Sequence, residues 1–243
     1  YKGICSVYLD GSADGDKAVG ITVNSKTHRT GVCNAMETLL VDSRSAEQLL
    51  PAVGQALAEK GVEMRSCQRA KAILGDLAVE ATNEDWDTEY LDLICSVRVV
   101  DGVDGALEHI NRHGSGHTEC IVTEDEATAR RFQLEADTST VFWNASTRFS
   151  DGGEFGMGAE IGISTDKIGA RGPMGLAELT TYKWLGEGAG LTRAAGGDVG
   201  NVGEVAEQLI VVFLPQRQAP GAVGRVGAGL EQRLGQRVVV AEQ

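Results

Sequence analysis

Residues 27–60 read THRTGVCNAMETLLVDSRSAEQLLPAVGQALAEK. Within them, residues 37–41 (ETLLV) form a short apolar run that is typical of a buried strand. Residues 45–60 then repeat apolar side chains at helical spacing, and the face that results holds Leu49, Leu50, Val53, Ala56 and Leu57. Ser43 or Ser45 is expected to cap this helix, and Gly61 to end it. The stretch therefore predicts a loop, a strand and a helix in succession.

The same alternation continues in both directions along the chain. We expect further strands at residues 4–9, 94–100, 120–123 and 140–143, and further helices at residues 16–23, 103–112 and 126–135. Strands that are separated by helical segments are typical of crossover units, so the sequence predicts an α/β fold with a largely parallel sheet. Beyond a glycine-rich segment at residues 151–162, we expect a strand at residues 180–185 and an ordered apolar run at residues 209–214.

The composition limits the classes of function. The chain has 243 residues and a formal net charge of −13, and 42% of its residues are hydrophobic. This apolar fraction is too high for a disordered chain, and no apolar run approaches the ~20 residues of a membrane span. A chain this acidic also lacks the basic surface of a nucleic-acid-binding protein. We therefore expect a protein that binds neither nucleic acid nor membrane.

Charge and cysteines add three expectations. All of the net charge lies in residues 1–189, because acidic and basic side chains balance in residues 190–243, so Gly190 is a candidate boundary. The first residue is Tyr1 and no leader precedes it, which indicates a processed chain or a fragment. The cysteines show no CxxC spacing, which argues against structural zinc and favours a reducing, cytoplasmic location; they are Cys5, Cys33, Cys67, Cys95 and Cys120.

Cys33 is the first candidate for chemistry. It lies in a predicted loop beside His28 and Arg29, and neighbouring cationic groups lower the pKa of a thiol and favour a nucleophile. The alternative is a small buried side chain without a chemical role, and spacing alone does not decide between the two.

The histidines are a second group of candidates. His109 and His113 would share a face of a predicted helix, as half of a metal site or as exposed residues near the helix C-terminus. His113 and His117 flank Gly-Ser-Gly, which breaks the helix, so this segment is expected to be a loop that lines a cleft.

The glycine-rich segment does not have the GxGxxG spacing of a dinucleotide site, and it is expected to allow tight turns or a close approach to a ligand. Arg148 and Arg171 are candidates for binding a carboxylate or phosphate, with surface ion pairs as the alternative.

Three motifs go further than periodicity. Residues 27–41 (THRTGVCNAMETLLV) and 141–186 (VFWNASTRFSDGGEFGMGAEIGISTDKIGARGPMGLAELTTYKWLG) closely resemble γ-glutamyl phosphate reductase. This family is the glutamate-5-semialdehyde dehydrogenase of proline biosynthesis, in the aldehyde dehydrogenase superfamily. Residues 109–125 (HINRHGSGHTECIVTED) resemble the same family, in the matching order. The resemblance covers about residues 1–188.

The resemblance implies that Cys33 is the nucleophile and that Asn34 belongs to the catalytic site. The Cys33 thiolate would attack L-glutamyl 5-phosphate and expel phosphate, and NADPH would reduce the resulting thioester to the semialdehyde. The backbone N–H of Cys33 or Asn34 would contribute to an oxyanion hole. No metal is implied. Substrate-binding roles are assigned from chemistry and location in the matching motifs to Asn144, Arg148, His117 and Arg171.

The resemblance also implies a fold and its domains. We expect an aldehyde-dehydrogenase-like catalytic domain with a parallel sheet at residues 21–165, preceded by the end of the cofactor-binding domain at residues 1–20. A return segment and oligomerisation strand would follow at residues 166–189, and residues 190–243 stay an unassigned glycine-rich tail. The family's N-terminal half, which supplies most of the cofactor site, has no counterpart here, so the chain alone is expected to bind little NADPH. Ser6 occupies the histidine position of the family's GxCHxYxD motif.

Two other functions remain open at this point. One is the reductase half of a bifunctional pyrroline-5-carboxylate synthase. The other is a non-catalytic remnant that acts as an interaction module through its TTYKWL strand. For the full-length enzyme, the resemblance implies a homo-oligomer and an association with glutamate 5-kinase.

Overall fold

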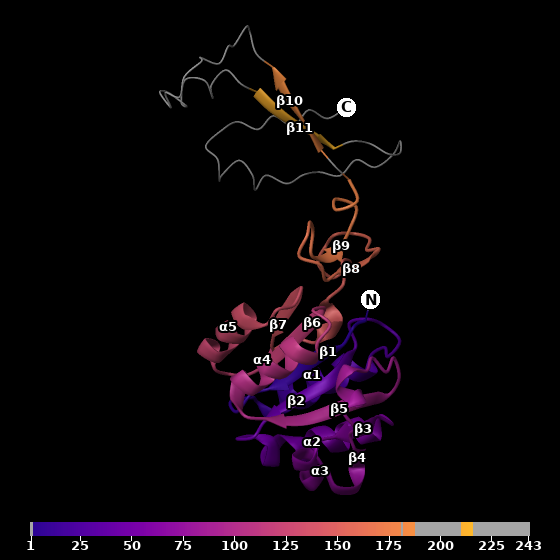
Figure 1. The fold of residues 1–243 in the computed structure, drawn as a ribbon, viewed down its shortest axis with the longest axis vertical. Helices are drawn as coiled ribbons and strands as arrows, with labels where there is room; N and C mark the ends of the chain where they lie inside the picture. The colour runs from indigo at the N-terminus through magenta and orange to yellow at the C-terminus, as the bar shows by residue number, and fades with distance from the viewer. Residues whose placement is uncertain (1, 181, 188–209, 216–243) are drawn as a thin grey trace. The chain divides into compact units, whose positions relative to one another are not determined.

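The computed structural model describes residues 2–180, 182–187 and 210–215. Its main element is a parallel sheet in the order β4-β3-β5-β2-β1-β6-β7 (Figure 1). β1 lies between β2 and β6, so the first described residues sit near the middle of the sheet. In chain order the strands are β1 (Cys5–Leu9), β2 (Met36–Asp42), β3 (Glu63–Ser66), β4 (Ala78–Glu80), β5 (Ile94–Val100), β6 (Thr118–Val122) and β7 (Thr140–Trp143).

Helices connect these strands and cover both faces of the sheet. α1 (Gly15–Thr27), α2 (Ala46–Glu59) and α3 (Gln68–Leu74) contribute buried side chains to one hydrophobic cluster. α4 (Gly102–His113) and α5 (Glu126–Glu135) contribute to a second cluster. Short 3-10 helices lie at η1 (Gly75–Leu77), η2 (Glu84–Asp87) and η3 (Thr147–Phe149).

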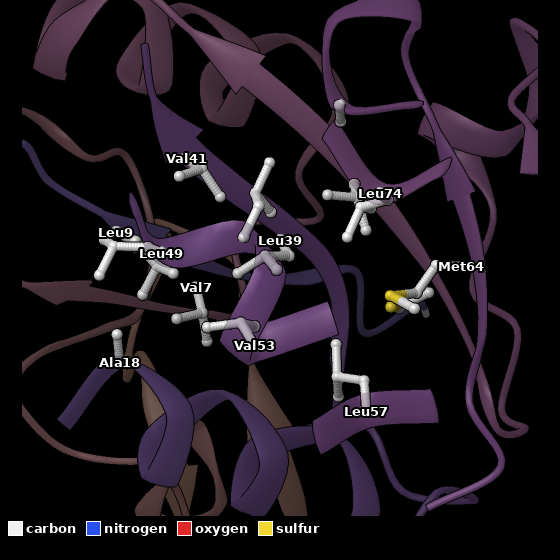
Figure 2. Close-up of a cluster of buried hydrophobic side chains, with 14 of the residues drawn as sticks. Val7, Leu9, Ala18, Leu39, Val41, Leu49, Val53, Leu57, Met64 and Leu74 are labelled. Carbon is white, nitrogen blue, oxygen red and sulfur yellow. The ribbon is translucent and has the colours of Figure 1, made fainter. Parts of the chain in front are cut away.

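Strand alternation distributes side chains between the two clusters. In β1, Val7 and Leu9 point into the cluster beneath α1 and α2 (Figure 2), whereas Tyr8 belongs to the cluster beneath α4 and α5. In β2, Leu39 belongs to the first cluster and Leu40 to the second. Every residue of both strands is buried. Strands that are covered on both faces of a sheet appear in the sequence as nearly continuous apolar runs.

The carboxyl ends of β1 and β2 are joined by a satisfied polar network. The Tyr8 hydroxyl donates to Asp10 Oδ1 at 3.2 Å and to Asp42 Oδ2 at 3.1 Å, and both carboxylates are buried. Arg44 donates to Asp42 through Nε and Nη2. Burial would raise the pKa of Asp42, but its hydrogen bonds with Arg44 outweigh burial and hold that pKa below its ordinary value.

The crossover pattern expected from the sequence is confirmed. The structure has a strand or helix at each segment predicted between residues 4 and 60 and between residues 94 and 143. One detail is wrong: Ser45 is at the N-cap of α2, yet its hydroxyl donates to the carbonyls of Asp10 and Asp42 and does not cap the helix. It therefore ties α2 to the sheet.

Residues 61–93 contain elements that the sequence pattern did not predict. β3 includes Glu63 and Arg65, which form an ion pair at 2.8 Å, and β4 has only three residues at the sheet edge. A charged strand such as β3, or a very short edge strand such as β4, gives no apolar run and no clear alternation.

The remaining strands are antiparallel pairs. β8 (Gly162–Ser164) pairs with β9 (Gly172–Met174) in the first compact unit, Tyr1–Gly175. In the second unit, Leu176–Gln243, β10 (Tyr182–Glu187) pairs with β11 (Ile210–Pro215), close to the strands expected at residues 180–185 and 209–214. The rest of the tail lies outside the described residues. Residues 1–20 supply β1 and the start of α1, and the domain boundaries at residues 20, 165 and 189 stay predictions.

Among the described residues, no helix combines the length and the apolar character that crossing a membrane requires.

Truncation of Leu50 tests the main hydrophobic cluster. Leu50 is fully buried on α2, so Leu50→Ala should lower the free energy of unfolding by about 2–5 kcal/mol. Leu134 is 86% exposed on α5, and Leu134→Ala should change that free energy by less than about 0.5 kcal/mol. Urea unfolding of both variants checks this, and equal losses would contradict the assigned core.

Candidate functional site

The exposed Cys33 lies in the loop of residues 28–35 that leads from α1 into β2. A second loop, residues 114–117, leads into β6. Because β2, β1 and β6 are parallel neighbours, their amino ends share one edge of the sheet. The loops that precede β2 and β6 therefore come together at this edge of the sheet, the amino edge, which is formed by the amino ends of the strands.

The backbone of Cys33 lies directly against the chain at Gly3. A Cβ atom at Gly3 would be 2.0 Å from the Cys33 carbonyl oxygen, closer than any side chain permits. The Cys5 thiol donates a hydrogen bond to the same oxygen at 3.2 Å, and the Gly3 N–H donates to Glu89 Oε1 at 2.8 Å. Gly3 thus permits a close approach that fixes the position of the cysteine loop.

Asn34 anchors the other side of the loop. Its side chain is 4% exposed, and Nδ2 donates to the Ser150 carbonyl at 2.9 Å. The amide oxygen Oδ1 is also buried and has no hydrogen-bond partner among the described residues. A buried acceptor without a partner beside an exposed thiol is suited to a ligand or a bound water.

His117 is held in one tautomer by a chain of hydroxyls. Its Nδ1 is 2.8 Å from Thr118 Oγ1, which donates to Ser150 Oγ at 2.9 Å, and Ser150 in turn donates to Thr140 Oγ1 at 3.4 Å. This direction makes His117 Nδ1 a donor and leaves Nε2 as a free acceptor, assigned from the network. Nε2 is buried without a partner among the described residues, and burial lowers the pKa of His117 to about 4, so the ring is neutral.

A buried carboxyl group lies behind this edge. Glu119 Oε2 accepts a hydrogen bond from the Ser6 N–H at 2.8 Å, whereas Oε1 has no partner in the described part of the chain. Burial raises the pKa of Glu119 to about 8, which favours the protonated acid at neutral pH. The sequence analysis did not identify Glu119, Glu89 or Glu160 as residues near the candidate site. Of the three, only Glu119 could have been noticed, because it is a charged residue inside an apolar strand.

The charges around Cys33 correct one expectation from the sequence. Although Cys33 is exposed, neighbouring atoms partly desolvate its sulfur and so raise the pKa of the thiol above its ordinary value; the carboxylates of Glu160 and Glu89 add to this, and the Arg148 guanidinium opposes them. The expected lowering by His28 and Arg29 is therefore wrong. Exposure of Cys33 also excludes the alternative of a small buried side chain.

The other predicted site residues lie at opposite ends of the strands. Arg148 lies near Cys33, and its Nε donates to His28 Nδ1 at 3.4 Å. Arg171 donates to Asp137 Oδ1 at 3.4 Å and approaches the loop before β6 at Gly116, while its buried Nε has no partner among the described residues. Asn144 binds Thr123 through both side-chain atoms beyond the carboxyl ends of β6 and β7, away from the other candidates.

The histidine pair on α4 binds other side chains. His109 is 5% exposed and its Nδ1 is 3.1 Å from Arg98 Nη1, and His113 Nδ1 is 2.8 Å from Asp87 Oδ1. The described residues contain no group of three or more side chains that is suited to hold a metal ion. The idea of half a metal site at this pair gains no support.

Alanine at position 3 tests the close approach to Cys33. Gly3→Ala places Cβ against a backbone oxygen, so the cysteine loop must move, and the free energy of unfolding should fall by about 1–3 kcal/mol. Gly31→Ala, in the same loop but with no atom within 4 Å of its Cβ position, should be nearly neutral. Urea unfolding distinguishes them, and equal stability of the two variants would contradict the contact.

Solved structures show what this arrangement is similar to. No protein-family model matches the chain. A γ-glutamyl phosphate reductase from Thermotoga maritima shares 49% sequence identity over 80% of this chain and 47% of its own, with a TM-score of 0.77. The enzyme of the same name from Saccharomyces cerevisiae shares 34% over 64% of this chain and 39% of its own, with a TM-score of 0.51.

A more distant structure supports the fold alone. An acetylating aldehyde dehydrogenase from Geobacillus thermoglucosidasius has a TM-score of 0.60 at 20% identity, over 80% of this chain and 52% of its own. The expected aldehyde-dehydrogenase-like fold is confirmed. The chain spans about half the length of these similar proteins.

Proposed function

The chain belongs to the γ-glutamyl phosphate reductase family, and from this premise we propose that it is the part of such an enzyme that carries the nucleophile. The reaction is the NADPH-dependent reduction of L-glutamyl 5-phosphate to L-glutamate 5-semialdehyde, a step of proline biosynthesis. The observation that supports this best is the exposed Cys33, held by its backbone at the amino ends of the strands, where buried polar atoms have no partner among the described residues.

The first chemical step is acyl transfer to Cys33. The sulfur adds to the acyl carbon, the bond between that carbon and the bridging phosphate oxygen breaks, and a thioester remains on Cys33. Because burial and the nearby carboxylates raise the thiol pKa, Cys33 rests in the protonated form near neutral pH. The thiol proton passes to the leaving phosphate, which departs as hydrogen phosphate, so charge and atoms balance.

Substrate binding is assigned to side chains around the loop. Arg148 is near enough to Cys33 to stabilise its thiolate and offers a guanidinium to the phosphate or the glutamyl carboxylate. His117 Nε2 and Asn34 Oδ1 are acceptors and suit the substrate's ammonium group or a bound water. Arg171 stands beside the loop before β6, and Asn144 stays a proposal from its motif alone.

The described residues do not fit a dinucleotide. The favoured place for a pyrophosphate is a helix N-terminus with free N–H groups. Here α1, α4 and α5 begin with acidic side chains, and α2 has Glu47 in its first turn. Asp14 caps α1 by accepting from the Lys17 N–H, Asp125 caps α5 by accepting from the Ala127 N–H, and Asp104 lies in the first turn of α4. The proposal therefore assigns NADPH binding to the part of the reductase that this chain does not contain, and no step is derived through the cofactor here.

The proposal extends to the setting of the whole enzyme. As in the family, we propose a homo-oligomer in the cytoplasm, with β10 as the oligomerisation strand, and an association with glutamate 5-kinase.

A chimera tests the proposed reaction. This chain is joined to the N-terminal half of the Thermotoga maritima reductase, and phosphate-dependent oxidation of glutamate 5-semialdehyde by NADP is measured. Cys33→Ala should lower kcat by about a thousandfold or more, since covalent catalysis is lost. Cys67→Ser, at the N-cap of α3, is the matched control and should keep most of the activity. Activity that persists in Cys33→Ala would rule out the nucleophile.

The charge next to Cys33 gives a pH prediction. Arg148 lowers the pKa of the thiol, so Arg148→Ala should raise that pKa further and slow alkylation of Cys33 by iodoacetamide at a fixed pH below it. Arg130→Ala, which removes an exposed guanidinium that pairs with Glu126 on α5, should leave the profile unchanged. The rate of alkylation measured against pH checks both variants. A lower midpoint of this profile in Arg148→Ala would contradict the stabilising effect of Arg148 on the Cys33 thiolate.

A further inference from the structure

A fully buried ion pair lies beneath the cysteine loop. Lys26 Nζ is 2.7 Å from Glu37 Oε2, and both side chains are 0% exposed. The Lys26 ammonium group makes no other hydrogen bond among the described residues, so Glu37 is the partner that compensates its charge. The second carboxylate oxygen, Glu37 Oε1, accepts a longer hydrogen bond from the Leu91 N–H at 3.4 Å.

The two partners stand at the two ends of the loop. Lys26 is in the last turn of α1, and Glu37 is the second residue of β2. The loop of residues 28–35 runs between them and exposes Cys33. A bond between Lys26 and Glu37 therefore closes the base of this loop and fixes the separation of its ends.

Stability alone is a weak reason for such a pair. Removing two charges from water is costly, and apolar residues of similar volume often stabilise a protein at least as well as a buried ion pair. Burial raises the pKa of Glu37, and Lys26 opposes that rise. Unlike an apolar contact, the ion pair forms a directional bond of fixed length.

Other contacts among the described residues hold the middle of the loop. The Cys33 carbonyl meets Cys5 and the backbone of Gly3, Asn34 binds Ser150, His28 accepts from Arg148, and the Ala35 N–H donates to the Val32 carbonyl at 3.1 Å. None of these contacts joins the end of α1 to the start of β2. We propose that Lys26 and Glu37 are a positioning pair, which holds the ends of the loop and so sets the place of the Cys33 thiol among Glu160, Glu89 and Arg148. This inference rests on the proposed role of Cys33 as the nucleophile.

The test uses Lys26→Met together with Glu37→Gln in the full chain. Methionine keeps much of the length of lysine, and glutamine keeps the shape of glutamate and an oxygen for the Leu91 N–H. Alkylation of Cys33 by iodoacetamide is followed from about pH 6 to about pH 10 by peptide mass spectrometry, with thermal unfolding in parallel. The probe reports on thiol position without substrate or cofactor.

The expected result is a shift in the pH profile of the folded variant. A loosened loop exposes Cys33 to solvent and moves it from Glu160 and Glu89, so the midpoint of alkylation should fall by about half a pH unit or more. Lys26→Arg, which keeps the charge, should retain a midpoint near that of the original chain. If the double variant does not fold, Lys26→Met alone provides the same reading, because a buried Glu37 without its cation can take up a proton and become neutral.

Asp42→Asn with Arg44→Met is the matched control, because this ion pair lies at the other end of the same strand. It should lower the melting temperature without moving the Cys33 midpoint. An unchanged midpoint in the folded Lys26→Met/Glu37→Gln variant, or an equal shift in the control, would overturn the proposal. A shifted midpoint together with an inactive chimera would refute the proposed reaction and leave the positioning pair in place.

Discussion

The Cys33 carbonyl rests on the backbone of Gly3, where no side chain intervenes, and receives a hydrogen bond from the Cys5 thiol. This contact joins the cysteine loop to the start of β1, the strand that pairs with both β2 and β6. One segment thus sets the register of the central sheet and supports the candidate nucleophile. Displacement of Gly3 would disturb the cysteine loop and the start of β1 at the same time.

The two ends of the same strands have different polar character. At the carboxyl ends, Tyr8, Asp10, Asp42 and Arg44 satisfy one another, and Thr123 Oγ1 donates to Asp10 Oδ2 at 2.9 Å. At the amino ends, buried polar atoms without partners gather among the described residues, on Asn34, His117 and Glu119. Native proteins rarely leave such atoms unpaired, and where they do a ligand or water is the usual reason. The contrast supports the proposal that the chemistry takes place at the amino ends of these strands.

The sequence predicted much of this fold because the central strands and helices are strongly patterned. β5, α5 and β7 have the predicted bounds, since apolar runs and amphipathic spacing decide them locally. β3 and β4 escaped prediction because β3 carries charged residues and β4 is a very short edge strand, and both depend on their neighbours for stability. The motif also indicated Cys33, but its electrostatic surroundings were not predictable. Glu89 and Glu160 are 56 and 127 residues away along the chain, and only the fold brings them near the thiol.

Formation of an acyl adduct tests the central claim, that Cys33 attacks an acyl phosphate. The full chain is incubated with acetyl phosphate, digested and examined by mass spectrometry, before and after neutral hydroxylamine, which cleaves thioesters. The account predicts one acetyl group on Cys33, removed by hydroxylamine, with little label on the half-buried Cys67. Equal labelling of Cys33 and Cys67, or an unlabelled Cys33 in a folded chain, would contradict it.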